Sequence, residues 1–161
     1  MTPVSAVEFR RAMGQFATGV TVVTTLDAGG RPLGLTVSAF ASVSLDPILV
    51  LVCIDNRSET HDGFDASQVF GVSILAEGQE DWSHRFAFGG SEKFAAVPMT
   101  MGTTGVPLVP GALAHVECRV RSRLPGGDHT IYVGEVMTLR VSPGRPLVYH
   151  ASAYRGLDPE G

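Results

Sequence analysis

Residues 18–54 read TGVTVVTTLDAGGRPLGLTVSAFASVSLDPILVLVCI and contain three runs of β-branched and other apolar side chains. Such runs favour β-strands, and two short turn segments separate them. The turn at residues 27–30 carries two glycines, and the turn at residues 44–47 ends in a proline. We therefore predict strands over residues 18–26, 33–43 and 47–54. Three successive strands with short turns favour an antiparallel meander or barrel over a doubly wound parallel sheet.

The rest of the chain continues this β-rich pattern. Further strands are predicted over residues 68–75, 113–124, 130–141 and 146–149, and helices over residues 5–16, 59–66 and 79–86. Ser5 and Glu8 match a helix-capping box, and Pro125-Gly126-Gly127-Asp128 is typical of a hairpin turn. Residues 92–110 are rich in Gly and Pro and are expected to form an irregular loop with one short strand. With six to eight strands and about three short helices, the chain is mainly β, a β-rich α+β domain, and a barrel would remove its sheet edges.

Composition limits the kind of protein this can be. The chain has 161 residues, which fits one domain over residues 1–161. Hydrophobic residues make up 44% and charged residues 17%, so the sequence is not disordered. The charged fraction is below the roughly 25% of an average soluble domain. This deficit suggests that a partner, a cofactor or a second copy of the chain covers apolar surface.

Charge and hydropathy exclude two classes of partner. The net charge is −4, without the basic footprint that a general nucleic-acid binder needs. The N-terminal residues lack the apolar core of a signal peptide, and the longest apolar stretch, residues 47–54, is too short to span a bilayer. We therefore expect a cytoplasmic protein that binds neither nucleic acid nor membrane.

Several common catalytic motifs are missing from the sequence. The five histidines show no HxH or HExxH spacing, so no metal is expected. The sequence contains no GxSxG, GxGxxG or P-loop pattern, which argues against a nucleophile-elbow hydrolase and a dinucleotide-binding βαβ unit. Cys53 and Cys118 lie in apolar runs without zinc spacing and are expected to be buried strand thiols.

Two polar segments at strand ends remain as candidates for chemistry. Alternation places Thr36, Ser38, Ser42 and Ser44 on one side of their strand if no bulge intervenes, although a solvated strand face explains the same pattern. Residues 56–61, NRSETH, follow an apolar strand and open a helix. Free backbone N–H groups there, together with an arginine, predict a phosphate seat. A capped helix with a solvated arginine is the alternative.

A third candidate lies in the turn at residues 126–130, GGDHT, where His129 begins a strand. His129 could project into a cleft as a hydrogen-bond donor. A histidine on a surface turn is the ordinary alternative.

Taken together, four segments resemble the short-chain flavin reductase family. They are residues 16–62, residues 85–97 (RFAFGGSEKFAAV), residues 107–136 and residues 146–157 (PLVYHASAYRGL), in the same order as in the family. The similarity spans residues 9–157, and the combination of TGVTVVTT, TVSAFASVSLDP and GGDHTIYVGEV makes it specific. The resemblance implies an FMN-binding split barrel, an antiparallel Greek-key-like barrel with a few short helices. It also implies a homodimer that reduces FMN or FAD with NADH or NADPH and supplies a partner flavin-dependent monooxygenase.

The resemblance also implies a set of site residues. The expected flavin contacts are Thr36, Val37, Ser38, Ala39, Ser42, Val43, Cys53, Ile54, Asp55, Arg57, Ser58, Arg85 and Phe86. Arg57 and Ser58 would hold the flavin phosphate, and Ala39 departs from the serine of many relatives. The nicotinamide nucleotide would meet His129, Tyr154 and Arg155, with His129 as the catalytic residue that orients it.

Two other functions stay open at this point. A flavoprotein of the same barrel could retain FMN and reduce another acceptor, which predicts turnover without added flavin. A non-catalytic flavin-binding module would bind flavin but consume no NADH or NADPH.

Overall fold

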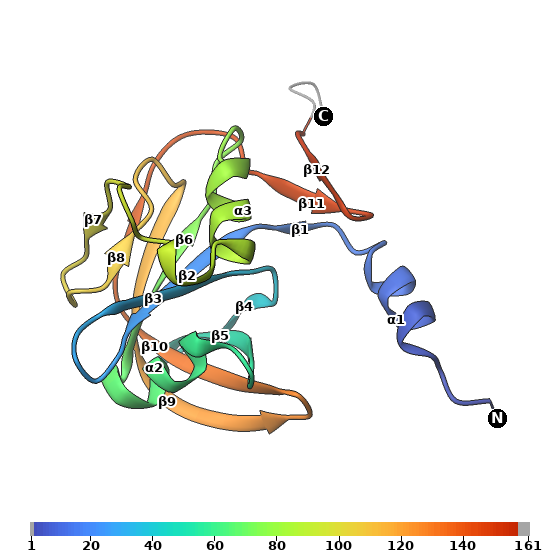
Figure 1. Ribbon diagram of the computed structural model, residues 1–161, viewed down its shortest axis with the longest axis horizontal. Helices are drawn as coiled ribbons and strands as arrows, with labels where there is room; N and C mark the ends of the chain where they lie inside the picture. Colours follow the sequence, from blue (N-terminus) through green and yellow to red (C-terminus); the bar gives the residue numbers. More distant parts are fainter. Residues whose placement is uncertain (1, 158–161) are drawn as a thin grey trace.

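The computed structural model describes residues 2–157 and is built around one large antiparallel sheet (Figure 1). The helices are α1 (Ala6–Met13), α2 (Glu59–Ser67) and α3 (Glu80–Phe88), with a short 3₁₀ helix η1 (Gly90–Glu92). The strands up to the middle of the chain are β1 (Thr18–Gly19), β2 (Thr21–Leu26), β3 (Pro32–Val37), β4 (Phe40–Leu45), β5 (Ile48–Asp55) and β6 (Val69–Ile74). The later strands are β7 (Thr100–Met101), β8 (Pro107–Leu108), β9 (Ala114–Gly126), β10 (His129–Val141), β11 (Val148–His150) and β12 (Ala153–Arg155).

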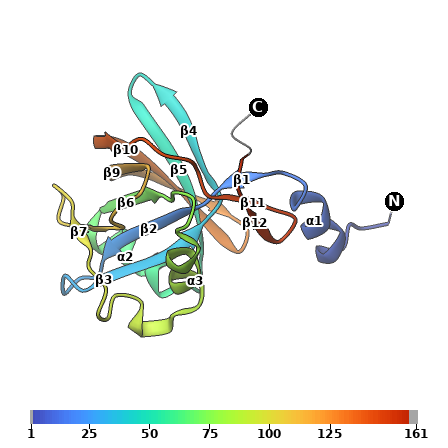
Figure 2. The same ribbon diagram turned by 90° about the horizontal axis from the view of Figure 1, so that it is seen from above.

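The order of strands in the large sheet shows that it is an open barrel. Seven strands follow one another as β3-β2-β6-β9-β10-β5-β4, all antiparallel. The two end strands, β3 and β4, are joined by only Ser38 and Ala39. The sheet must therefore curl until its two edges meet at this corner, as Figure 2 shows from above. Each edge strand keeps one row of backbone N–H and C=O groups that no neighbouring strand of this sheet takes up.

The inside of the barrel is filled by side chains from every strand of the large sheet and by α2. Phe64 of α2 stacks on Tyr132 of β10 with ring centroids 4.4 Å apart, and Phe70 of β6 lies 5.1 Å from Phe64. All three rings are fully buried. A Cβ at Gly134 would overlap the Phe70 ring, so glycine is required where β10 crosses this aromatic group.

α1 is the one helix that leaves the body of the described chain. The Ser5 hydroxyl caps it by accepting from the Glu8 backbone N–H, and the Glu8 carboxylate accepts a hydrogen bond from the Ser5 backbone N–H at 3.0 Å, which confirms the capping box. The helix ends at Met13, three residues earlier than predicted. It buries no residue, so its apolar side has no cover within the described chain.

Two expectations about residues 33–44 were wrong. The predicted strand over residues 33–43 is interrupted at Ser38 and Ala39, because the chain turns there from one sheet edge to the other. The ladder between β4 and β5 also shifts at Val43. Thr36, Ser38, Ser42 and Ser44 therefore do not form one hydroxyl face, since both a corner and a bulge interrupt the alternation.

Most other predicted elements are confirmed within a few residues. The long hairpin β9–β10 turns at Gly127 and Asp128, and the loop over residues 92–110 carries two short paired strands, β7 and β8, rather than one. Cys118 is buried, while Cys53 is only half-buried. Among residues 2–157, none of the helices combines the length and the apolar character needed to cross a lipid bilayer.

Candidate functional site

A groove runs between the edge strand β3 and helix α3. The Thr36 hydroxyl donates to the Ser83 carbonyl oxygen at 2.6 Å, and the Lys93 ammonium donates to the Gly34 carbonyl oxygen at 3.1 Å. Because side chains alternate along a strand, residues 34 and 36 share the side of β3 that faces these groups. The groove holds one pocket at the beginning of β3 and another at its end.

The first pocket has the donors that a phosphate needs. It encloses about 240 Å³ and is lined by Arg31, Pro32, Leu33, Gly34, Ser58, Glu59, Thr60, Gly90, Lys93 and Phe94. Ser58 caps α2 by accepting a hydrogen bond from the Thr60 backbone N–H at 3.1 Å, so the positive end of the helix dipole opens here. Lys93 is half-buried, and burial lowers the pKa of its ammonium group. An anion in this pocket would compensate that desolvation.

The second pocket is aromatic and lies where β3 ends. It encloses about 350 Å³ and is lined by Val20, Thr36, Ser38, Ser83, His84, Ala87, Phe88, Tyr149, Ser152 and Tyr154. The His84 ring meets the Tyr154 ring edge to face at 5.2 Å and lies parallel to the Phe88 ring at 6.1 Å. The Ser83 and Tyr154 hydroxyls are 2.7 Å apart. Aromatic walls with a few fixed hydroxyls suit a planar, partly polar ring.

The corner between β3 and β4 continues the groove. Ser38 lines the aromatic pocket and also a third pocket of about 360 Å³ that includes Phe16, Thr21 and Phe40. The Ala39 carbonyl oxygen accepts a hydrogen bond from the Cys53 backbone N–H at 3.1 Å. This bond brings two of the predicted flavin residues, Ala39 at the corner and Cys53 of β5, next to each other.

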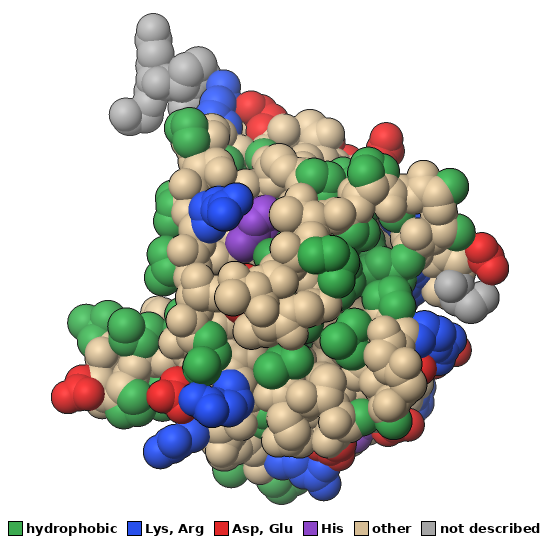
Figure 3. Space-filling model, turned by 90° about the vertical axis from the view of Figure 1, so that its left-hand side faces the viewer, with side chains coloured by type: hydrophobic (Ala, Val, Ile, Leu, Met, Phe, Trp, Pro, Cys, Tyr) green, Lys and Arg blue, Asp and Glu red, His purple; other side chains and the backbone are tan. Residues whose placement is uncertain are grey.

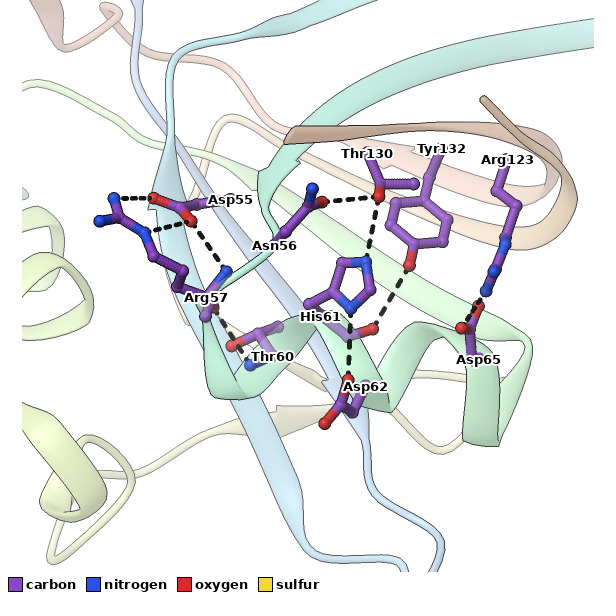
Figure 4. A network of polar contacts seen from close by, with 11 residues as sticks. Asp55, Asn56, Arg57, Thr60, His61, Asp62, Asp65, Arg123, Thr130 and Tyr132 are labelled. Carbon is purple, nitrogen blue, oxygen red and sulfur yellow. Dashed lines mark hydrogen bonds and ion pairs between the residues drawn. The ribbon is translucent and has the colours of Figure 1, made fainter. Parts of the chain in front are cut away.

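Arg57 lies beside Asp55 (Figure 4) and does not line the first pocket. Its guanidinium binds both Asp55 carboxylate oxygens, at 3.2 and 2.9 Å, and its side chain is 84% exposed. This ion pair holds the pKa of Asp55 well below its usual value. An incoming phosphate would therefore compete with Asp55 for Arg57, and the predicted phosphate role of Arg57 stays a prediction.

His129 begins β10 beside the end of β5, two residues before Arg57. His129 pairs with Asp55 across β10 and β5, and its Nδ1 lies 2.7 Å from the Asp128 carboxylate. The hydrogen bond from His129 lowers the pKa of Asp128. His129 does not line the aromatic pocket, which His84 lines instead.

A polar network fastens the first turn of α2 to β10 (Figure 4). The His61 Nε2 lies 3.0 Å from the Thr130 hydroxyl, which donates to the Asn56 side-chain oxygen at 2.8 Å. The Tyr132 hydroxyl donates to the His61 carbonyl oxygen at 3.4 Å. These contacts set the position of the α2 N-terminus and hence of Ser58 at the first pocket.

The remaining predicted residues fall into two groups. Val37, Ile54 and Phe86 point into the hydrophobic interior and can offer a ligand only their backbone atoms. The side chains of Ser42, Val43, Arg85 and Arg155 are exposed on β4, α3 and β12.

Sequence reasoning missed residues at both pockets. Lys93 and Arg31 line the first pocket, and Ser83 and His84 line the second. Lys93 had a detectable signal, because it is the only lysine of the chain, among eleven arginines. Ser83 had none, because its two partners lie 47 and 71 residues away in the sequence.

Comparison with known proteins identifies the family. The model of the flavin reductase like domain matches residues 13–158. The chain belongs to this flavin reductase family. This membership confirms the resemblance seen in the sequence, and the open antiparallel barrel agrees with the expected split barrel.

Two flavin reductase family relatives and one solved structure illustrate the similarity. The chain is 39% identical over 153 residues to the flavin-dependent monooxygenase reductase subunit HsaB of Rhodococcus jostii, covering 94% of this chain and 78% of that protein. It is 40% identical over 164 residues to an NADH-dependent FAD reductase of Streptomyces globisporus, covering 98% and 89%. The structure of the Streptomyces globisporus NADH:FAD oxidoreductase SgcE6 with NAD and FAD fragments superimposes with a TM-score of 0.90 at 40% identity, covering 96% and 93%.

Proposed function

We propose that this chain is an NAD(P)H:flavin oxidoreductase that reduces FMN or FAD and supplies the reduced flavin to a partner monooxygenase. The observation that carries the proposal is the groove along β3, with a cationic pocket at one end and an aromatic, hydroxyl-lined pocket at the other. A flavin nucleotide has the matching arrangement of an anionic phosphate and a planar ring. Relatives named as NADH-dependent FAD reductase and monooxygenase reductase subunit support the same reaction.

Lys93, Arg31 and the N-terminus of α2 would hold the flavin phosphate. Lys93 is half-buried and already oriented by the Gly34 carbonyl oxygen at 3.1 Å, so it needs little rearrangement to meet an anion. Arg57 is near the same helix end and could join once it releases Asp55. FMN and FAD both carry a phosphate here, and riboflavin carries none.

The corner between β3 and β4 would hold the ring. Thr36 and Ser38 line the aromatic pocket, and the open edges of β3 and β4 offer backbone N–H groups to ring oxygens and nitrogens. Such fixed donors favour negative charge as it develops on the ring. Among the further predicted contacts, Cys53 adjoins this corner, because its backbone N–H donates to the Ala39 carbonyl oxygen.

A bound flavin supplies the acceptor for the hydride and spreads the electron pair over its ring system. The protein has to hold the nicotinamide flat against that ring and keep disordered water away. The hydrogen bond between the Tyr154 and Ser83 hydroxyls supports such a role for Tyr154, and His84 and Phe88 extend the same wall. His129 stays the predicted orienting residue, at the Asp55 side of the site.

Three finer statements belong to this proposal. The names of two relatives support NADH over NADPH as the electron donor. The low charged fraction and the uncovered apolar helix α1 support a homodimer. The cytoplasmic location remains a prediction from the sequence.

One assay tests the proposed reaction. The loss of NADH and of NADPH absorbance is followed with FMN, FAD and riboflavin added in turn. We expect consumption of NADH that depends on added FMN or FAD. Steady turnover without added flavin would instead indicate a flavoprotein that retains FMN. Flavin binding without any consumption of NADH or NADPH would overturn the enzyme assignment.

A further inference from the structure

One chain of side-chain hydrogen bonds joins the first turn of α2 to the hairpin turn that leads into β10 (Figure 4). It runs from His61 of α2 through Thr130 of β10 to Asn56, the residue after β5. The His61 Nε2 lies 3.0 Å from the Thr130 hydroxyl oxygen, which lies 2.8 Å from the Asn56 side-chain oxygen. The Asn56 side-chain nitrogen then donates to the Gly127 carbonyl oxygen at 3.4 Å.

Each hydrogen bond of this chain can run in only one direction. The Gly127 carbonyl oxygen can only accept, so the Asn56 amide nitrogen faces it and the amide oxygen faces Thr130. That amide oxygen also only accepts, so it takes the single hydroxyl proton of Thr130. The Thr130 oxygen therefore accepts from His61, which requires a proton on the His61 Nε2. A ring with this proton donates whether or not its Nδ1 also carries one.

At one end of the chain, His61 belongs to the helix turn that lines the first pocket. Its backbone N–H donates to the Ser58 carbonyl oxygen at 3.0 Å. Ser58 and Thr60 line the pocket where the flavin phosphate is expected. The His61 side chain is only 18% exposed, and its ring meets the Tyr132 ring edge to face at 5.9 Å. The position of this ring on β10 therefore affects the wall of the first pocket.

At the other end of the chain, Asn56 holds the turn before His129. Its backbone N–H donates to the Asp128 carbonyl oxygen at 3.0 Å, in addition to the side-chain bond to Gly127. Asn56 thus binds both residues of the turn between β9 and β10. His129 is the next residue and is the predicted orienting group for the nicotinamide. The placement of that group therefore depends on this turn.

The hydrophobic core already attaches α2 to the barrel without this chain. Phe64 stacks on Tyr132, and both rings are fully buried. Packing of this kind supplies most of the stability of a helix in a protein. Asn56 is exposed, so its hydrogen bonds add little to the free energy of unfolding. What the chain adds is a fixed spacing between the first turn of α2 and the β9–β10 turn.

We propose that His61 is a positioning residue that sets the phosphate end and the nicotinamide end of the site relative to each other. Through Thr130 and Asn56 it holds the first turn of α2 against the turn that precedes His129. This inference rests on the proposed function, which assigns the flavin phosphate to one turn and the nicotinamide to the other. Hydride transfer needs closely aligned reacting atoms, so a small displacement of either turn costs rate.

The first test removes the donor with His61→Leu. Loss of one hydrogen bond should raise the Kd for FMN roughly 5-fold and slow hydride transfer to the bound flavin by a similar factor. Fluorescence titration measures the Kd, and stopped-flow reduction at saturating FMN and NADH measures the rate. The Kd for riboflavin, which has no phosphate, should stay within about 2-fold. A change in only one of the two FMN constants would overturn the proposed link between the two ends.

Two further variants test the hydrogen bond itself. His61→Gln keeps an amide donor near the position of Nε2 and should recover both constants to within about 2-fold of the wild-type values. Thr130→Val breaks the same chain at its middle, so adding His61→Leu to it should cause no further loss. The proposal is overturned if His61→Gln is as impaired as His61→Leu, or if the losses add in the double variant.

His115→Leu is the matched control for the loss of a histidine hydrogen bond. The His115 Nε2 lies 2.7 Å from the Val109 carbonyl oxygen. His115 lines a separate pocket beside β7, on the side of the molecule that Figure 3 shows. Whatever its effect on Tm, this variant should leave the Kd for FMN and the hydride-transfer rate unchanged. Equal changes in His115→Leu and His61→Leu would show that both constants follow stability alone, and the positioning role would be wrong.

The proton on the His61 Nε2 can be observed without any turnover. Nitrogen-15 NMR of the flavin-free full chain should show the wild-type His61 ring protonated at Nε2, and a bare Nε2 would overturn the proposal. Failure of the proposed function gives a different result, because the wild-type chain would then consume no NADH while the His61 signal stayed the same. An active wild-type protein whose His61→Leu variant keeps both constants would overturn the positioning role alone.

Discussion

The Ser83 hydroxyl lies 2.7 Å from the Tyr154 hydroxyl, while the Ser83 carbonyl oxygen accepts a hydrogen bond from Thr36 at 2.6 Å. Ser83 is buried, and through these contacts it joins β3, α3 and β12. Tyr154, near the C-terminal end of the described chain, and Thr36 of β3 both line the aromatic pocket. Ser83 thus links the position of Tyr154 to that of Thr36.

Tyr154→Phe should affect the nicotinamide nucleotide and spare the flavin. The variant keeps the aromatic ring and loses the hydrogen bond to Ser83, which is worth about 1 kcal/mol, so the KM for NADH should rise roughly 5-fold. Flavin affinity, measured by fluorescence quenching, should stay within about 2-fold, since the strand that carries Thr36 is untouched. Tyr149→Phe is the control, because Tyr149 packs on Tyr154 with centroids 5.4 Å apart but is not joined to Ser83. An equal rise of KM in both variants would contradict the positioning role of Ser83.

Lys93→Met should weaken FMN far more than riboflavin. Lys93 is the only side-chain ammonium of the chain and is half-buried in the first pocket, where it lies 3.1 Å from the Gly34 carbonyl oxygen. A hydrogen bond to a charged partner is worth about 1.5–3 kcal/mol, so the Kd for FMN should rise roughly 10- to 100-fold. The measurement is a titration of the variant with FMN, FAD and riboflavin.

Arg57→Ala is the comparison that locates the phosphate. If Arg57 is the main phosphate contact, Arg57→Ala should lower FMN affinity more than Lys93→Met does. If Arg57 stays paired with Asp55, Arg57→Ala should lower FMN affinity only slightly. Equal losses for FMN and riboflavin in both variants would argue against a phosphate site at this end of the groove.

The charge of Lys93 also predicts a pH dependence of FMN binding. Burial lowers the pKa of Lys93, and an adjacent phosphate raises it again. FMN affinity should therefore fall as the pH rises through the pKa that Lys93 has in the flavin-free protein. Riboflavin binding should lack this fall, and so should FMN binding to Lys93→Met. The same slope in Lys93→Met would assign the titration to another group.

Local sequence patterns predicted most strands and helices of the barrel but not the corner between its two edge strands, β3 and β4. The β-branched runs of β2 and β5, the Ser5–Glu8 capping box and the glycine turn before His129 act over a few residues, and each was readable. The corner at Ser38 and Ala39 contains neither glycine nor proline, so no local pattern marks it as a turn. The chain turns there because the sheet closes on itself. β7 and β8 are two residues each and carry no periodicity.

The site was predictable where a motif carried it and not where distant segments meet. Thr36 and Ser38 lie in such a motif and do line the groove. Phe86 lies in another, yet its side chain is buried, since motif resemblance does not show which way a side chain points. Ser83 gains its importance only from partners on β3 and β12.

His129→Ala should slow NADH oxidation about 10-fold and leave flavin affinity nearly intact, because the side chain is expected to orient the nicotinamide through a hydrogen bond. Stopped-flow reduction of bound flavin measures this step directly. His129→Gln keeps a donor and should recover part of the rate. A loss in His84→Ala with none in His129→Ala would move the orienting role to the aromatic pocket, whose wall contains His84.

Glu117→Gln should destabilise the protein at neutral pH and much less in acid. The buried Glu117 carboxylate accepts hydrogen bonds from the Thr103 and Thr104 backbone N–H groups, at 3.0 and 2.7 Å, and from the Thr104 hydroxyl at 2.6 Å. Burial works to raise the pKa of Glu117, but these bonds outweigh it and the pKa is lowered. A carboxyl group whose pKa is lowered by folding stabilises the protein at pH values above its unfolded pKa, about 4.3. That stability is lost as the pH falls through the folded pKa.

The Glu117→Gln substitution should cost about 1.5–3 kcal/mol of unfolding free energy at pH 7, or roughly 3–10 °C in Tm. The difference in Tm between the variant and the wild-type protein should narrow below pH ~4. The exposed pair of Glu77 with Arg145 makes Glu77→Gln the control, expected within about 1 kcal/mol of wild type at either pH. A Tm gap that stays constant from pH 7 into the acid range would show that the Glu117 charge contributes nothing to stability.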